Sequence, residues 1–214
     1  MNENIYANAR PLFQKVMAAF IASLLIATIG LYAGQFVPPA FMVPLSIAEL
    51  IMIIAAFWLR RKKAVGYLFL FAFTFISGIT IFPVVSYYGS QAGAEVILMA
   101  LGTTFIIFAV MGILGTIMKT DVSFLGSFLL IALLGIVIVW VLNLFMPLNS
   151  ANLLIISGIS AIVFSLYILF DFNQMKHRGI SEEMIPLLAL NLYLDFINLF
   201  TNLLRMLGIL ENDD

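Results

Sequence analysis

The 214-residue sequence contains no cysteine and a single histidine, His177. The absence of cysteine excludes disulfides, thiolate metal sites and thiol catalysis. One histidine cannot build a histidine-rich metal site, and His177, between Lys176 and Arg178, is typical of a solvated loop. Only 10% of the residues are charged, and the ten Lys and Arg residues are spread along the chain. The sequence therefore offers no basic face for a nucleic acid.

Hydrophobic residues make up 64% of the chain, and the mean hydropathy is +1.15. Soluble domains are about half apolar and a quarter charged, so this composition indicates a polytopic membrane protein. A membrane-spanning helix needs about 20 apolar residues. Such runs lie at about 16–37, 41–59, 64–86, 94–118, 124–146, 151–172 and 184–208. The first run is too long for a signal-peptide core, so we expect it to remain as a helix. The prediction is an all-α integral membrane protein, a single domain over residues 1–214 with seven transmembrane helices.

The basic residues predict the orientation of these helices. Nine of the ten lie before the first run or in the second, fourth and sixth connections, which share one face of the membrane. The connections on the opposite face contain none, and Arg205 alone is left for that side. We therefore expect the N-terminus in the cytoplasm and the acidic C-terminal tail outside. Gly30 and Gly34, four residues apart on the first helix, fit close helix packing.

The last apolar run carries a narrow polar stripe. At 100° per residue, its members lie within an arc of about 60°: Asn191, Asp195, Asn198 and Asn202, with Arg205 extending the stripe outward. Lipid cannot satisfy such a face, so it must point into the helix bundle or a water-filled path. Hydrogen bonding between helices is one role for the asparagines. A carboxylate is a costly choice for that task, and Asp195 has no basic residue within nine positions.

Asp171, near the end of the sixth run, suggests a partner for Asp195. Two carboxyl groups a few ångströms apart cannot both ionise cheaply, so such a pair holds one proton over part of the physiological pH range. When both are ionised, their oxygens can bind Ca²⁺ weakly. When one ionises, it can instead hold Arg60, which closes the second run. Competition among a proton, Arg60 and Ca²⁺ for the same oxygens would form a gate.

The heights of the two aspartates pose a difficulty. Asp171 lies at the end of its predicted helix, whereas Asp195 lies about eleven residues, or roughly 16 Å, along the next. They meet only if the last helix begins below the membrane plane. Ser181 is suited to cap such an extension, and Glu182 and Glu183 suit its first turn.

Two segments resemble the transmembrane Bax-inhibitor-motif family: DFNQMKHRGI, from Asp171, and the closing ALNLYLDFINLFTNLLR, residues 189–205. The resemblance extends over the seven-helix layout and is closest to bacterial members described as pH-sensitive calcium leak proteins. It implies a central seventh helix surrounded by the other six and a cytoplasmic-facing pair, here Asp171 and Asp195. It further implies that Arg60 on the second helix latches the pair and that movement of this helix opens a pore. Glu49 would lie on the moving helix and Asn198 on the pore lining. The short acidic tail departs from the eukaryotic relatives.

The resulting hypothesis is a pH-sensitive Ca²⁺ leak channel of a bacterial inner membrane. Its ligands are Ca²⁺ and protons, and it needs no cofactor and catalyses no reaction. Glu49, Asn191, Asn198 and Asn202 are the pore-lining candidates, and a monomer could suffice. A proton-coupled Ca²⁺ transporter is the alternative, because sequence does not separate leak from exchange. An intramembrane aspartyl protease is a remote alternative, since its Gly-x-Gly-Asp signature is replaced by Leu192-Tyr193-Leu194 before Asp195.

Overall fold

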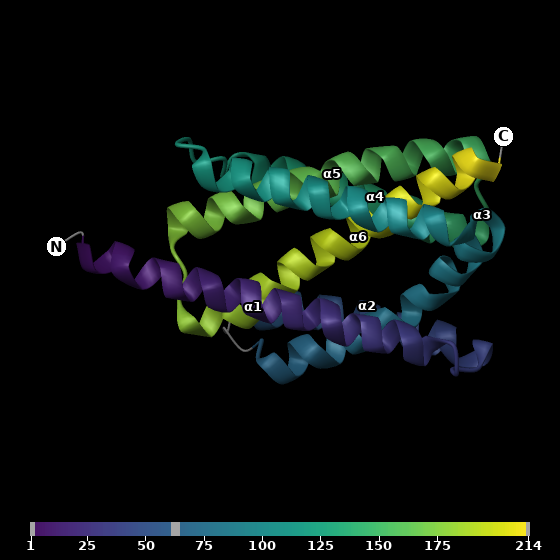
Figure 1. Ribbon diagram of the computed structural model, residues 1–214, viewed down its shortest axis with the longest axis horizontal. Coiled ribbons are helices and arrows are strands. Elements are labelled where there is room, and N and C mark those ends of the chain that lie inside the picture. Colours follow the sequence, from purple (N-terminus) through teal and green to yellow (C-terminus); the bar gives the residue numbers. More distant parts are fainter. Residues whose placement is uncertain (1–2, 61–64, 213–214) are drawn as a thin grey trace. The chain divides into compact units, whose positions relative to one another are not determined.

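The computed structural model describes residues 3–60 and 65–212, and for residues 3–10, 57–60, 144 and 212 it describes the backbone alone. Long helices account for most of this part of the chain, which contains no strand (Figure 1). The elements are α1 (Glu3–Gly34), η1 (Pro39–Phe41), α2 (Met42–Arg60), α3 (Tyr67–Ile117), α4 (Leu125–Phe145), α5 (Ser150–Arg178), η2 (Glu182–Met184) and α6 (Ile185–Asn212). All six α-helices are long and apolar enough to cross a membrane. The prediction of an all-α membrane protein is therefore confirmed.

The structure has six long helices within the described ranges where the sequence predicts seven. The predicted runs at 64–86 and 94–118 both fall within α3, which has 51 residues. A straight helix of that length would measure about 76 Å, more than twice the apolar thickness of a bilayer.

The helix α3 is interrupted at Gly93, whose φ of 84° and ψ of 169° are not helical. Glycine adopts a positive φ without the steric penalty that other residues meet. A Cβ placed on Gly89 would lie 2.8 Å from Ile97 Cδ1. Residues eight apart on a straight helix are separated by about 12 Å along the axis. The chain therefore bends sharply at Gly93 within unit 2.

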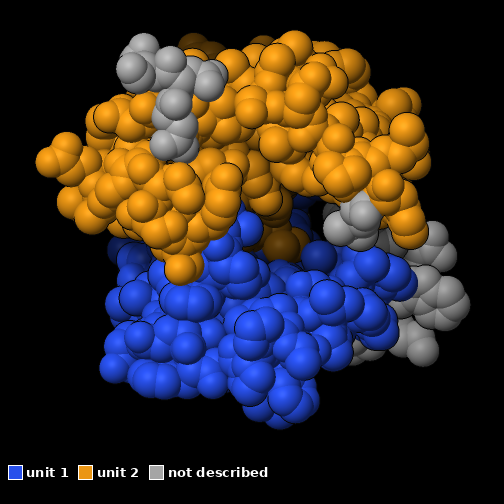
Figure 2. Space-filling model, turned by 90° about the vertical axis from the view of Figure 1, so that its right-hand side faces the viewer, with its two compact units in different colours: residues 1–84, 178–193 blue, residues 85–177, 194–214 orange. Residues whose placement is uncertain are grey.

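The chain forms two compact units (Figure 2). Unit 1 contains residues 1–84 and 178–193, so it holds α1, α2, the first part of α3 and the start of α6. Its tightest packing joins α1 to α3. A Cβ on Gly30 would lie 2.2 Å from Phe75 O, and one on Gly78 would lie 2.1 Å from Ala27 O. The predicted close packing at Gly30 is thus confirmed, and Gly78 supplies the matching surface.

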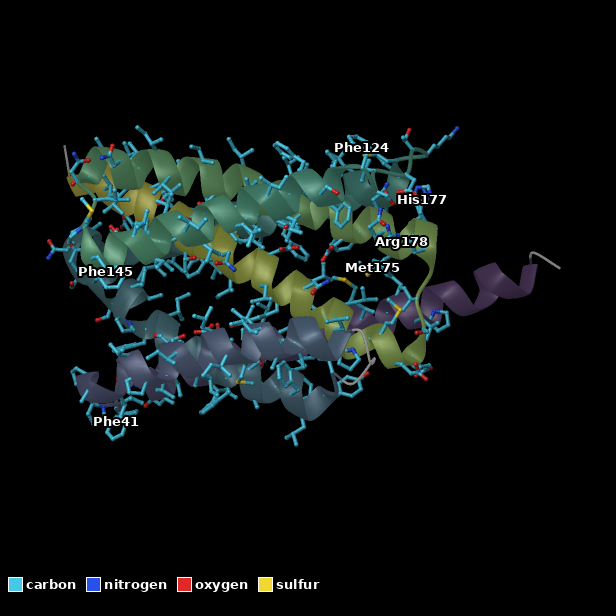
Figure 3. All side chains as sticks on the ribbon, turned by 180° about the vertical axis from the view of Figure 1, so that it is seen from behind. Phe41, Phe124, Phe145, Met175, His177 and Arg178 are labelled. Atoms are coloured by element: carbon cyan, nitrogen blue, oxygen red, sulfur yellow. The ribbon has the colours of Figure 1, made fainter. Side chains whose placement is uncertain are left out.

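Unit 2 contains residues 85–177 and 194–214. Leu129 and Ile136 of α4 pack against Val163 of α5 in a buried apolar cluster. The second part of α6 joins this group, since Met206 contacts α5 near Gly158. Figure 1 shows α4, α5 and this part of α6 running side by side. In Figure 3, Phe124 and His177 lie at one end of the unit and Phe145, the last residue of α4, lies at the other.

The last helix is the most deeply buried of the six, with 56% of the residues of its apolar window buried against 6% for α2. Its first part packs in unit 1, where Tyr193 meets the ring of Phe73 edge-on. Its second part packs in unit 2, where Phe196 contacts Phe105 and Phe108 of α3. Helix α6 thus contributes to the core of both units, and the arrangement of six helices around it stays a prediction.

Candidate functional site

Asp195 is buried on the second part of α6, in unit 2. Its side chain is only 6% exposed, and its Oδ2 atom has no hydrogen-bond partner among the described residues. The neighbouring Phe196 anchors this turn of the helix against two rings of α3. An ionised carboxylate is strongly disfavoured in such a place unless it is paired.

Asp171 lies on α5 and is half-buried. Its carboxyl group interacts electrostatically with that of Asp195. The hydroxyl of Tyr167, one turn before Asp171 on the same helix, interacts electrostatically with both carboxyl groups. We call Tyr167, Asp171 and Asp195 the acidic cluster. The tyrosine was not predicted, although its spacing of four residues from Asp171 puts both side chains on one helix face.

The observed length of α5 reduces the expected difference in height between the aspartates. This helix continues to Arg178, six residues past its predicted end at 172. Asp171 therefore lies about 10 Å before the end of α5, and Asp195 about 15 Å after the start of α6. The expected cap at Ser181 is wrong: its side chain makes no capping hydrogen bond, and a short 3₁₀ turn precedes α6 instead.

The asparagines of the polar stripe bond to their own helix. Asn198 Nδ2 donates to Leu194 O at 2.7 Å, and Asn202 Nδ2 donates to Asn198 O at 2.7 Å. Asn202 is 2% exposed, and its Oδ1 atom has no partner in the described part of the chain. Asn191 is half-buried. These two bonds lie within α6 and do not link it to another helix.

Arg205 ends the stripe in unit 2. Its guanidinium lies 4.2 Å from the ring centroid of Trp140 on α4, a cation–π contact. Arg205 and Tyr88 also interact electrostatically. Arg205, Trp140 and Tyr88 thus form one group in unit 2.

Glu49 lies on α2 in unit 1, where it is half-buried. Thr80 Oγ1 of α3 donates to Glu49 Oε2 at 2.6 Å, and the hydroxyl of Tyr193 interacts with the same carboxyl group. Thr80 was not predicted as a partner, because no sequence signal pairs a residue of one helix with one 31 positions away. Arg60 is the last residue of α2, and its side chain lies outside the part that the structure describes. Its role as a latch stays a prediction.

The end of α5 is fastened to the connection between α3 and α4. Asn173 is fully buried; its Oδ1 accepts from Val122 N at 3.0 Å, and its Nδ2 donates to Thr120 O at 3.0 Å and Gly115 O at 3.4 Å. Lys176 Nζ donates to Met118 O at 2.8 Å. We call Asn173 and its three backbone partners the α5 clamp. Asn173 lies two residues after Asp171, and this clamp was not predicted from the sequence.

Asp121 lies in the same connection and is exposed. Its Oδ1 atom accepts from Ser123 Oγ at 2.6 Å, from Ser123 N at 2.8 Å and from Gln174 Nε2 at 3.0 Å. Hydrogen bonds to a carboxylate favour its ionised form. The bonds from Ser123 and Gln174 accordingly lower the pKa of Asp121 from 3.8 to about 2. Asp121 is therefore ionised at any physiological pH and cannot sense changes near neutrality.

The described residues contain no group of three or more His, Cys, Asp or Glu side chains that could hold a metal ion. The acidic cluster supplies two carboxyl groups and one phenol. Ca²⁺ takes six to eight oxygen ligands, so two carboxylates with water would bind it weakly and release it readily.

Comparisons with known proteins place this arrangement in context. Residues 9–212 match the family model described as inhibitor of apoptosis-promoting Bax1. An uncharacterized protein of Helicobacter pylori is 32% identical over 224 residues, covering 100% of this chain and 96% of its own. Bax inhibitor 1 of Schizosaccharomyces pombe is 34% identical, covering 70% of this chain and 54% of its own. The Escherichia coli modulator of FtsH protease YccA is 32% identical, covering 71% of this chain and 68% of its own.

Proposed function

Because this chain belongs to the Bax inhibitor family, we propose that it is a pH-sensitive Ca²⁺ leak of a bacterial inner membrane, gated by Asp171 and Asp195. Membership of the family and the six long apolar helices make it a multi-pass membrane protein. The leak itself is inferred from the acidic cluster and from the resemblance described above.

The observation that carries the proposal is the buried, unpartnered carboxylate oxygen of Asp195 within reach of the charge on Asp171. A buried ion pair that loses one partner destabilises a protein by about 3–5 kcal/mol, because the remaining charge is buried and uncompensated. The pair is therefore expected to hold a proton unless a cation neutralises it. Protons and Ca²⁺ compete for the same oxygens, which couples conduction to pH.

The proposed gate uses Arg60 as the competing cation. At alkaline pH the ionised pair holds Arg60 and closes the path. Partial protonation near pH 6 weakens this ion pair, so the path opens. Glu49, Asn191, Asn198 and Asn202 are the proposed oxygen ligands along the way, and the free Oδ1 atom of Asn202 supports this assignment.

The proposed topology has seven crossings, with α3 crossing twice around Gly93. The close approach of Gly89 and Ile97 supports the reversal. The N-terminus is placed in the cytoplasm and the C-terminus outside, following the distribution of Lys and Arg. In this topology the acidic cluster and the α5 clamp lie toward the cytoplasmic side.

A test of the proposal reconstitutes the protein in liposomes that contain a Ca²⁺-sensitive dye and records influx from pH 6 to 8. An ionophore holds the proton gradient at zero. The leak predicts pH-dependent influx without a gradient, whereas a proton-coupled transporter, the alternative mechanism, loses its influx under the clamp. Arg60→Ala is expected to raise influx at pH 8 toward its value at pH 6, and unchanged influx at pH 8 would remove the latch from the mechanism.

A second candidate function is suggested by the name of the Escherichia coli relative, a modulator of FtsH protease. The chain could then act on a membrane-bound protease as a partner. Degradation of a membrane substrate by FtsH, reconstituted with and without this chain, tests that function. A change in the degradation rate that persists in Asp195→Asn would support modulation independent of ion flow.

A further inference from the structure

The two faces of α5 near its C-terminal end contact different parts of the protein. Phe172 and Asn173 face α3 and its following connection, since Phe172 packs against Phe108 and Asn173 bonds to Thr120 and Val122. Asp171 instead interacts with Asp195 on α6. Successive residues turn by about 100° on a helix, so Asp171 and Asn173 point in nearly opposite directions, about 160° apart. The two side chains therefore lie on nearly opposite faces of α5.

The backbone of α5 rests directly on α3 at this level. A Cβ on Gly115 would lie 2.4 Å from Leu169 O and 3.2 Å from Asn173 N. This close approach fixes the distance between the helices, but a smooth glycine surface does not by itself fix the rotation of α5. Directional hydrogen bonds do, because their strength falls steeply when the angle departs from linearity.

Asn173 provides those directional bonds. Both its amide oxygen and its amide nitrogen bond to backbone groups of the 115–122 segment. It is fully buried, so a rotation of α5 that broke these bonds would leave polar groups unsatisfied at a cost of about 1–3 kcal/mol each. The neighbouring Gln174 reinforces the same attachment through Ser123 and Asp121.

We propose that Asn173 is a positioning residue for the acidic cluster: its hydrogen bonds set the rotation of α5 that turns Asp171 toward Asp195. The inference rests on the proposed function and adds a residue that touches neither ion nor proton. It makes α5 and the α3–α4 connection the fixed side of the gate, against which the remaining side moves.

Described charged and titratable groups lie on both sides of this position. Asp195 faces Asp171 from α6, and Tyr167 shares its helix face. On the clamp side, Asp121 carries a constant charge between pH 6 and 8 because its pKa is about 2. Lys176 bonds to a backbone carbonyl of the connection, and His177 interacts with Asp121.

The test compares Asn173→Ala with Asn143→Ala in the liposome assay. Asn143 is a matched control, because its Oδ1 accepts from Leu148 N at 2.8 Å at the far end of α4. Asn173→Ala is expected to reduce the ratio of influx at pH 6 to influx at pH 8 at least twofold, while Asn143→Ala leaves it unchanged. In an Asp171→Asn background, Asn173→Ala should have no further effect on the ratio.

Amide hydrogen exchange at Val122 supplies a readout that does not depend on transport. Asn173→Ala should expose this amide, and Gln174→Ala provides a milder variant if the alanine at 173 prevents folding. The positioning role would be overturned if Asn173→Ala and Gln174→Ala kept the wild-type ratio of influx at pH 6 to influx at pH 8 while the Val122 amide became exposed. An effect that persists in Asp171→Asn would also overturn it. The absence of influx in the wild type would instead defeat the proposed function.

Discussion

At the scale of single residues, the balance between burial and charge decides what each acid can do. Asp195 is buried and lacks a hydrogen-bond partner at Oδ2, whereas Asp121 is exposed and accepts three hydrogen bonds at one oxygen. Burial favours the neutral form of a carboxyl group, and hydrogen bonding favours the ionised form. Two aspartates in the same unit thus have opposite tendencies, and only the buried one is suited to respond to pH near neutrality.

Asp121→Asn is expected to leave the pH profile of influx unchanged between pH 6 and 8. The pKa of Asp121 is lowered to about 2, so its contribution to stability is complete above about pH 4 and is lost as the pH falls toward 2. The melting temperature should therefore differ from wild type by a constant amount between pH 6 and 8. A shifted influx profile in this variant would assign pH sensing to the connection instead of the acidic cluster.

Residue patterns predict Asp171 and Asp195 because a charge in an apolar run stands out at once. The same reasoning misses Tyr167, Thr80 and Asn173, since a tyrosine, a threonine or an asparagine carries no comparable penalty in a helix. Their roles depend on which helices become neighbours. Arg60 is predicted from its place at the end of a run and from the resemblance to the family.

At the scale of elements, glycine sets how closely the helices of unit 1 approach. Gly78→Ala is expected to destabilise the protein by about 1–3 kcal/mol, because the added Cβ would lie 2.1 Å from Ala27 O, a backbone atom that cannot move alone. Gly102→Ala is the matched control, since nothing lies within 4 Å of its added Cβ. Thermal unfolding in detergent should separate the two variants. Equal melting temperatures would contradict the close packing of α1 and α3.

Helix positions follow from the apolar runs, but helix ends do not. The runs locate all six long helices, because about 20 apolar residues suffice to cross a bilayer. Helix α5 nevertheless continues to Arg178 through polar residues, where the hydrogen bonds of Asn173 and Gln174 support it. The break in α3 lies at Gly93, between the apolar runs at 64–86 and 94–118 that the sequence predicts as two separate helices.

At the scale of the whole molecule, the charge distribution and the reversal at Gly93 lead to one topology. Each basic connection lies on the proposed cytoplasmic face, and Ser90, just before the reversal, lies on the other. Since the chain has no cysteine, a single engineered cysteine reports its own side of the membrane.

Ser90→Cys is expected to react with a membrane-impermeant thiol reagent added outside intact cells, while His177→Cys reacts only after the membrane is opened. Both side chains are exposed, so access to the reagent decides the outcome. Labelling of His177→Cys in intact cells would reverse the orientation. Protection of Ser90→Cys under both conditions would mean that α3 does not turn at the membrane surface.

Gating by the acidic cluster is tested by the ratio of Ca²⁺ influx at pH 6 to that at pH 8 in Asp195→Asn liposomes, with the proton gradient held at zero. Glu95→Gln serves as the control, because Glu95 is an exposed acid on α3 of the same unit. We expect a ratio near one for Asp195→Asn and a wild-type ratio for Glu95→Gln. A wild-type ratio in Asp195→Asn would contradict the acidic cluster as the gate.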